Sequence, residues 1–104
     1  MENKTKAQTF IGFAIRARKC KIGTNAVATL KKANLVIVCY TASENTKQEA
    51  DKLAKKFNCP SIETVGVKLE DITHKENAKV MAIADKQLSA AILSNSEKDF
   101  IARI

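Results

Sequence analysis

Two continuous apolar runs restrict the folds that this 104-residue chain can adopt. Residues 35–40 read Leu-Val-Ile-Val-Cys-Tyr and residues 80–84 read Val-Met-Ala-Ile-Ala. Both runs have the length of a strand, and their continuity predicts strands that are covered on both faces. Neither approaches the roughly 20 apolar residues of a membrane-spanning helix, and the N-terminus leads into no signal-peptide core. We therefore expect a cytoplasmic protein that does not enter a membrane.

Amphipathic helices are expected beside these strands. Thr5 and Gln8 have the spacing of a capping box, and the apolar residues after them recur at helical spacing, namely Ala7, Phe10, Ile11, Ala14 and Ile15. Asn45 and Gln48 predict a second capping box, at the start of a helix that Pro60 is expected to stop. Shorter helices are expected over residues 67–73 and around residues 88–92.

The remaining segments complete an α/β pattern. Residues 61–65 predict a short strand, and a final turn is expected to dock Phe100, Ile101 and Ile104 on the body of the protein. The alternation of helices and strands predicts a three-layer α/β/α sandwich with a small sheet between the helices. A chain of this length has room for one hydrophobic core, so we expect a single domain over residues 1–104.

The net charge of +7 is concentrated in the first third of the chain. Residues 1–32 carry eight Lys or Arg and one acidic residue, whereas residues 33–104 carry ten of each sign. Positive charge confined to one segment indicates a surface for a polyanion, whereas an even spread would indicate little beyond solubility. The alternative, a chance excess of lysine on a solvated helix, stays open on charge alone.

The segment of residues 19–32 is where this charge meets the start of a helix. Gly23 predicts a turn, and Thr24 or Asn25 is expected to cap a short second helix. A helix start offers unpaired N–H groups and a favourable dipole to an anion, and Gly23 has no side chain to hold a phosphate away. The competing interpretation is that Thr24 or Asn25 only caps the helix.

Cationic side chains are expected to surround this helix start. Arg16, Lys19 and Lys21 precede it, and Lys31 and Lys32 are expected to close the second helix. Asn25 carries both a donor and an acceptor, which suits an adenine edge or a non-Watson–Crick pair. The candidate RNA-binding residues are Arg16, Lys19, Lys21, Gly23, Thr24, Asn25, Lys31 and Lys32.

The sequence offers little for catalysis. The three cysteines, Cys20, Cys39 and Cys59, have neither the spacing of zinc ligands nor the density of a disulfide scaffold. His74 is the only histidine, and no nucleophile stands at a recognisable spacing from it. We expect no catalytic residue, metal site or cofactor, and a small redox or hydrolytic domain using Cys20 or His74 is the enzymatic alternative. Tyr40 and most phenylalanines follow core-facing patterns, which predicts little base stacking.

Four collinear segments resemble a known family. Residues 10–19 resemble "LLGLARRAGK", residues 35–38 resemble "LVLL", residues 42–46 resemble "ASxNT", and residues 75–85 resemble "GKxxRVVAVTD". These motifs are those of the bacterial YlxQ-type branch of the kink-turn-binding ribosomal protein superfamily. That superfamily includes ribosomal proteins of the L-seven-Ae and L-thirty-e kind. The match covers nearly the whole chain in order.

The resemblance implies an α/β/α sandwich with a mixed sheet that binds kinked RNA, whose sheared G·A pairs accept the start of the second helix. That helix begins Gly-x-Asn-Glu in the family, with a lysine further along. Gly23, Thr24 and Asn25 match, but Ala26 stands at the Glu position and Thr29 at the Lys position. A carboxylate on guanine contributes on the order of 1–3 kcal/mol of discrimination, so selectivity is expected to weaken more than backbone attraction. Residues 74–78 align with a loop that presses apolar residues on an extruded nucleotide in stronger binders, and here this loop is polar.

The leading hypothesis is a monomeric, non-enzymatic protein that binds structured RNA, with ribosomal RNA among the expected partners. Arg16, Lys19 and Lys21 would contact phosphates, the backbone of Gly23 and Thr24 would donate N–H groups, Asn25 would read a non-canonical pair, and Lys31 and Lys32 would supply outer charge. The alternative is a protein-interaction module of the same fold that has lost specific RNA binding.

Overall fold

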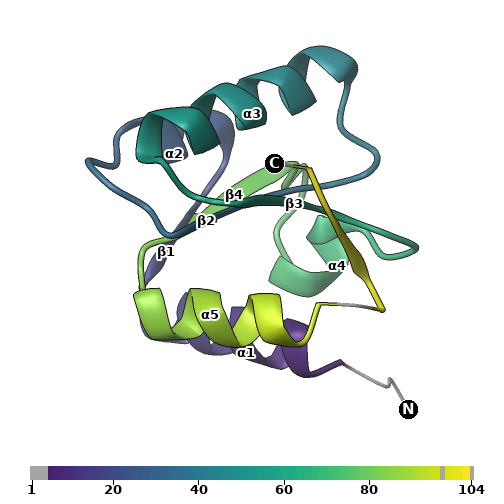
Figure 1. Cartoon of the computed structure of the whole chain (residues 1–104). Helices are drawn as coiled ribbons and strands as arrows, with labels where there is room; N and C mark the ends of the chain where they lie inside the picture. Colours follow the sequence, from purple (N-terminus) through teal and green to yellow (C-terminus); the bar gives the residue numbers. More distant parts are fainter. Residues whose placement is uncertain (1–4, 97, 104) are drawn as a thin grey trace.

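The computed structural model describes residues 5–96 and 98–103 and shows a sheet between two layers of helices (Figure 1). This arrangement confirms the predicted α/β/α sandwich. Within the described residues, no helix is long and apolar enough to cross a bilayer. The elements follow one another as α1 (Lys6–Arg16), β1 (Cys20–Ile22), α2 (Thr24–Ala28), β2 (Leu35–Val38), α3 (Glu44–Phe57), β3 (Ser61–Thr64), α4 (Leu69–Thr73), β4 (Val80–Ile83), α5 (Lys86–Ser94) and β5 (Phe100–Ala102).

The five strands form one mixed sheet in the order β1-β4-β2-β3-β5. Strands β2 and β3 are parallel, and the other three neighbouring pairs are antiparallel. Parallel neighbours need a long crossover, and α3 provides it. Strands β1 and β5 are the two edges of the sheet, and each is three residues long.

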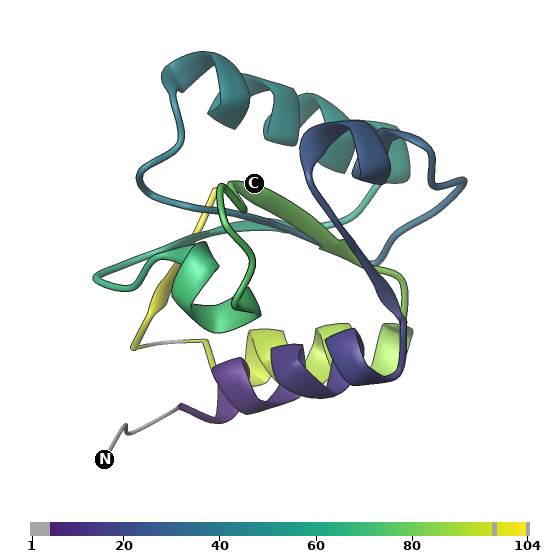
Figure 2. The same ribbon diagram turned by 180° about the vertical axis from the view of Figure 1, so that it is seen from behind.

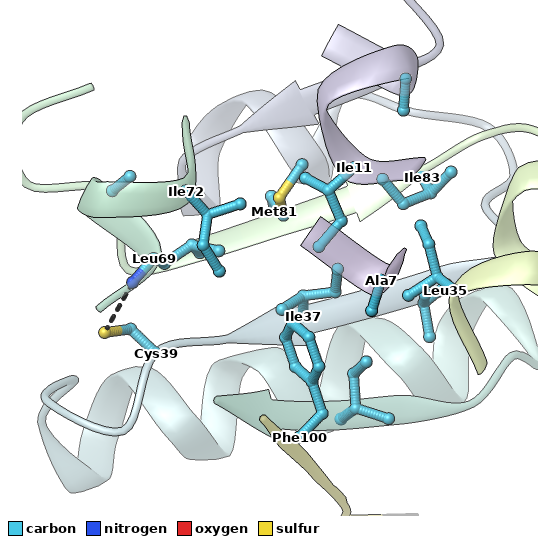
Figure 3. Close-up of a cluster of buried hydrophobic side chains, with 14 residues drawn as sticks. Ala7, Ile11, Leu35, Ile37, Cys39, Leu69, Ile72, Met81, Ile83 and Phe100 are labelled. Carbon is cyan, nitrogen blue, oxygen red and sulfur yellow. Dashed lines mark hydrogen bonds between the residues drawn. The ribbon is translucent and has the colours of Figure 1, made fainter. Parts of the chain in front are cut away.

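The sheet is buried on both faces, as the run of residues 35–40 predicted. All four residues of β2 are buried. Leu35 and Ile37 pack against the layer formed by α1, α4 and α5, whereas Val36 and Val38 pack against α2 and α3. Figure 3 shows the first of these two layers, where Ile11 of α1 lies close to Met81. Each fully buried aliphatic side chain of this kind contributes about 1.5–3 kcal/mol, so both faces of the sheet drive folding.

Helix α1 begins where the sequence predicted. Thr5 is the N-cap residue, and its hydroxyl oxygen accepts a hydrogen bond from the backbone N–H of Gln8 at 3.2 Å. The reciprocal half of the capping box is not formed, because the Gln8 side chain donates to Asp99 Oδ2 at 2.8 Å instead. This bond ties the start of α1 to the residue that precedes β5.

Helix α3 begins and ends at residues that the sequence analysis did not select. Its N-cap is Ser43, whose hydroxyl accepts from the N–H of Thr46 at 3.1 Å. The prediction of Asn45 as the cap was wrong, because Asn45 already lies inside the helix. The last helical residue is Phe57, and the C-cap residue Asn58 adopts the left-handed conformation with φ 53°, so the helix stops before Pro60.

The predicted final turn is a strand. Phe100 pairs with Thr64 in an antiparallel register and is buried, as expected for a residue that docks on the body. Ile101 points the other way, because successive side chains of a strand alternate, and it is 54% exposed. The docking prediction was therefore wrong for Ile101, and Ile104 lies outside the described residues.

Candidate nucleic-acid interface

The C-terminal end of α1 exposes three cationic side chains. The backbone turns sharply after the helix, because Arg18 adopts the left-handed conformation with φ 57° and the Lys19 N–H donates to Ala14 O at 2.9 Å. This is the hydrogen-bonding pattern of a Schellman motif. Arg16, Arg18 and Lys19 are all exposed as a result. Arg18 was not among the predicted site residues, although the charge count included it.

A strand that the sequence analysis missed separates Lys19 from Gly23. Strand β1 pairs with β4, and it is held at both ends: Lys19 O accepts from Ala84 N–H at 2.7 Å, and Gly23 N–H donates to Val80 O at 2.7 Å. Extended chain advances about 3.3 Å per residue, so the Cα atoms of Lys19 and Gly23 are about 13 Å apart. Strand β1 is therefore a spacer that carries the exposed Lys21, and the turn predicted at Gly23 lies between this strand and α2.

Helix α2 begins at a glycine and has no side-chain cap. Gly23 is the N-cap residue with φ 101° and ψ 143°, and its carbonyl accepts from Val27 N–H at 2.9 Å. The prediction that Thr24 or Asn25 caps this helix was wrong, because both already belong to the helix. Asn25 is exposed, and within the described chain its side chain makes no hydrogen bond, so its amide is open to a ligand.

The end of α2 also differs from the expectation. The helix stops at Ala28, and Lys31 and Lys32 lie exposed in the loop that follows instead of closing the helix. The hydroxyl of Thr29, the C-cap residue, donates to Ala26 O at 2.6 Å. Ala26 and Thr29 stand at the two positions where the family resemblance implied Glu and Lys. Their short side chains place no charged group on this part of the α2 surface.

The cationic residues line one side of the molecule and do not converge on one point. Asn34 N–H donates to Ile83 O at 2.8 Å, so the loop that holds Lys31 and Lys32 lies at the same end of the sheet as Lys19. The start of α2 lies at the opposite end. Figure 2 shows the end of α1, strand β1 and helix α2 following one another along this side. We name the six cationic residues on it, Arg16, Arg18, Lys19, Lys21, Lys31 and Lys32, the basic edge.

No acidic side chain in the described part of the chain forms an ion pair with a residue of the basic edge. The ion pairs that the structure describes all lie within residues 47–103: Lys47 with Glu63, Lys52 with Glu49, Lys79 with Glu70, and Arg103 with both Asp51 and Glu63. The four carboxylates in these pairs, Glu49, Asp51, Glu63 and Glu70, all have partners from the second part of the chain. The sequence-level charge asymmetry becomes an asymmetry in space.

Lys75 is a further cationic residue near this surface, and the sequence analysis did not select it. Burial raises the pKa of the Cys20 thiol, and the positive charges of Lys21 and Lys75 partly oppose that rise. Both ammonium groups therefore lie near the Cys20 side chain, although Lys75 comes from the loop between α4 and β4. The alignment of residues 74–78 with a ligand-contacting loop was the available signal.

Two aromatic residues are exposed on the surface. Tyr40 follows β2 and is 41% exposed, and Phe13 on α1 is 43% exposed. The core-facing prediction was wrong for Tyr40, because the run of residues 35–40 leaves the sheet after Val38. Phe13 lies outside the apolar stripe of α1, and its exposure agrees with the stripe that the sequence predicted. Gly23 and Cys39 bond to neighbouring carbonyls at the start of β4, so Tyr40 lies at the same end of the sheet as the start of α2.

Comparison with known proteins identifies a solved structure with a similar fold but gives no information on function. No protein family model matches the sequence, and no curated protein matches it. Among solved structures, the chain is similar to a protein of unknown function from Bacillus halodurans C, with a TM-score of 0.71 and 24% sequence identity. The alignment covers 88% of this chain and 96% of that chain. At this identity the likeness establishes a shared fold alone.

Proposed function

We propose that the chain binds structured RNA through the basic edge and carries out no catalysis. The observation that supports this proposal is the set of six exposed cationic side chains that have no acidic partner among the described residues, while the ion pairs gather in residues 47–103. RNA supplies phosphates along an extended line, and a line of cationic residues about as long as β1 and its flanks matches such a ligand better than a compact anion.

The geometry divides the proposed work between two ends of β1. Arg16, Lys19 and Lys21 contact phosphates, and Lys31 and Lys32 add charge at the same end of the sheet as Lys19. At the other end, Thr24 presents a backbone N–H group and Asn25 reads a non-canonical base pair. The Gly23 N–H already donates to Val80 O, so the prediction that it would contact RNA was wrong. The proposal includes membership of the YlxQ-type branch and association with ribosomes, on the strength of the collinear segments described above.

Ala26 and Thr29 limit the selectivity that we expect. Neither residue can accept from a guanine amino group through a side-chain carboxylate, and discrimination of this kind is worth about 1–3 kcal/mol. We therefore expect a kink-turn RNA to be preferred over a straight duplex, but by less than in a protein with the full Gly-x-Asn-Glu helix start.

Gel shifts with a kink-turn RNA and a straight duplex of equal length test the proposal. Lys19→Gln/Lys21→Gln removes two cations of the basic edge, and Lys55→Gln/Lys86→Gln removes two exposed cations from α3 and α5 as a matched control. Each lost phosphate contact should lower the slope of log K against log salt by about 0.7–0.9, so the first variant should lose about 1.4–1.8 and the control nothing. Equal losses in both variants would reduce the binding to non-specific attraction.

A protein-interaction module is the second candidate, and the bare helix surface at Ala26 and Thr29 favours it. This function predicts a protein partner that stays bound to the chain after nuclease treatment. If the wild-type protein fails to shift either RNA at physiological salt, the interaction module becomes the better interpretation of the fold.

A further inference from the structure

Strand β5 is an edge of the sheet, and its outer side has no partner strand among the described residues. The strand order ends at β5, and β3 is its neighbour on the inner side. Figure 1 shows β5, in yellow, on the side of the sheet away from β1. An edge strand presents unpaired N–H and C=O groups, and these can pair with a strand of another chain. Strand β5 is therefore a candidate interaction surface.

The bonds to β3 identify the backbone groups that face the open edge. Arg103 N–H donates to Ser61 O at 2.8 Å, at the end of the paired segment. Residues that bond to the neighbouring strand alternate along an antiparallel pair, so Ile101 also bonds to β3. Phe100 and Ala102 lie between these positions and direct their backbone groups to the outer side.

Three of these four backbone groups are available to a partner strand. The Phe100 N–H donates to Ser96 O at 3.1 Å. The Phe100 carbonyl remains, as do the N–H and the carbonyl of Ala102, which is an exposed residue. A strand that runs antiparallel to β5 can bond to these groups in the alternating pattern that β3 shows on the inner side.

Apolar side chains are exposed at this edge. Ile101 on β5 is 54% exposed, and Val65, directly after β3, is 44% exposed. Natural edge strands are commonly protected from pairing by lysine or proline. Strand β1 carries Lys21, whereas β5 consists of Phe100, Ile101 and Ala102 and has neither residue type. One edge of the sheet is thus protected against a second chain, and the other edge is not.

The distribution of charge favours a second copy of this chain as the partner of β5. The charged residues beside the edge balance, because Lys47 and Arg103 pair with Asp51 and Glu63. The basic edge lies on and around β1, at the opposite edge of the sheet. Two copies with a net charge of +7 repel each other least when their basic edges point away from each other, and contact through β5 gives this orientation. A strongly acidic partner would be attracted to the basic edge instead.

We propose that two copies of this chain associate through β5, which pairs antiparallel with the partner's β5 around a two-fold axis at Ile101. Ile101 then lies opposite the partner's Ile101 in a non-hydrogen-bonded pair, and Phe100 lies opposite the partner's Ala102. The two five-stranded sheets become one continuous sheet. Neighbouring strands are about 4.8 Å apart, so the two β1 strands, and the basic edges with them, lie about 43 Å apart.

This association differs from the monomer that the sequence predicted, and it does not require RNA. A three-residue strand buries less area than the roughly 1,200 Å² of stable complexes, so we expect a weak dimer. Salt should strengthen the dimer, because it screens the repulsion between the two copies. Salt weakens any contact that RNA bridges, so the two kinds of association respond to salt in opposite directions.

Sedimentation equilibrium of the nuclease-treated protein, from about 10 µM to about 1 mM, measures the association. The average mass should rise from one chain toward two with concentration, and it should rise further when the salt is increased. Ile101→Lys should weaken the association at least about ten-fold, because like charges directly opposite each other destabilise a strand pair. Tyr40→Lys changes another exposed apolar residue to the same cation and should keep the association. Circular dichroism melts verify that both variants fold.

Disulfide formation tests the register without the Ile101→Lys variant. The Cα atoms of a non-hydrogen-bonded pair are about 4.5 Å apart, which a disulfide can span. Ile101→Cys should therefore give a linked dimer with oxidised glutathione, and mass spectrometry should locate the link at position 101. Ala102→Cys places the two thiols on diagonal positions about 7–8 Å apart, beyond the reach of a disulfide. The wild-type chain, with its own three cysteines, is the background control.

Four results would overturn the proposal. They are a wild-type protein that stays monomeric up to about 1 mM, an association that Ile101→Lys leaves unchanged, equal linking of Ile101→Cys and Ala102→Cys, and a dimer that disappears as the salt is increased. The last result would assign the association to bridging RNA. A monomer that binds RNA would overturn this inference alone, whereas a β5 dimer that binds no RNA would overturn the proposed function alone.

Discussion

Replacing Gly23 by alanine tests whether backbone conformation alone fixes the start of α2. Gly23 has φ 101° and ψ 143°, a region that residues with a side chain rarely adopt. A Cβ atom at this position would meet nothing within 4 Å, so the substitution causes no clash. The cost of Gly23→Ala is therefore conformational strain, on the order of 1–3 kcal/mol.

Gly12 supplies a matched control within the same chain. A Cβ atom at Gly12 also meets nothing within 4 Å, but Gly12 lies in α1 and is not among the glycines with positive φ. Alanine is favoured over glycine by about 0.8–1.0 kcal/mol in a helix interior. Gly12→Ala should therefore stabilise the protein, so the same chemical change has opposite signs at the two sites.

Thermal and urea denaturation followed by circular dichroism measure both effects. In a domain of this size, 1 kcal/mol shifts Tm by about 4–8 °C. We expect Gly23→Ala to lower Tm by at least about 4 °C and Gly12→Ala to raise it by about 4–8 °C. A Gly23→Ala protein that melts at or above the wild-type temperature would refute the reasoning, because the turn from β1 into α2 would then not depend on glycine.

Two further predictions concern stability and thiol chemistry. Arg103 donates to Asp51 and Glu63, and its bond to Asp51 lowers the pKa of that carboxyl group. Arg103→Ala should lower the free energy of unfolding by about 1–2 kcal/mol, measured by urea titration at pH 6. Because the pKa of Asp51 is depressed in the folded state, the difference between wild type and variant should shrink as the pH falls below about 4. A difference that stays constant down to pH 2 would contradict the ion-pair explanation. Burial raises the pKa of Cys20, so its alkylation by iodoacetamide at pH 7.5 should be slower than that of a free thiol. The buried Cys39 should react only after the protein unfolds. Mass spectrometry of timed samples measures both reactions. Rapid alkylation of Cys39 in the native protein would contradict its burial.

The elements with long or continuous patterns were predictable from sequence. Helix α1 shows two full repeats of helical spacing, and its stripe predicted the buried residues Ala7, Ile11 and Ala14. Strand β2 is continuous and apolar because helices cover both of its faces. In both cases burial requires apolar residues at the buried positions of the element, and the pattern of these residues is visible in the sequence.

The edge strands were not predictable in the same way. Strands β1 and β5 have three residues each, too few to show a period of two. Strand β1 forms by pairing with β4, and β5 forms by pairing with β3. A local sequence pattern does not show which strand of the sheet is available for such pairing. The spacing of about 13 Å between Lys19 and Gly23 follows from this missed strand, so residue types were predictable in the candidate site but their arrangement was not.

Exposure at element ends was also decided by tertiary structure. Tyr40 continues an apolar run in the sequence, but the chain leaves the sheet after Val38, so the aromatic ring is 41% exposed. Lys75 reaches the neighbourhood of Cys20 only because the loop between α4 and β4 lies against the end of α1 and β1. Contacts between segments that are distant in sequence determine both the exposure of Tyr40 and the position of Lys75. A local sequence pattern does not predict such contacts.

Protection of an exposed strand edge is a competing explanation for part of the basic edge. Lysine on an edge strand blocks pairing with a second chain, and this accounts for Lys21 on β1. The other edge strand is a natural comparison, and β5 exposes Ile101 at 54% with no lysine among its three residues. Arg16, Lys31 and Lys32 lie outside any strand, so edge protection does not explain them. The positive charge thus extends beyond the edge strand β1 into the end of α1 and the loop after α2, as expected for the RNA-binding surface that we propose.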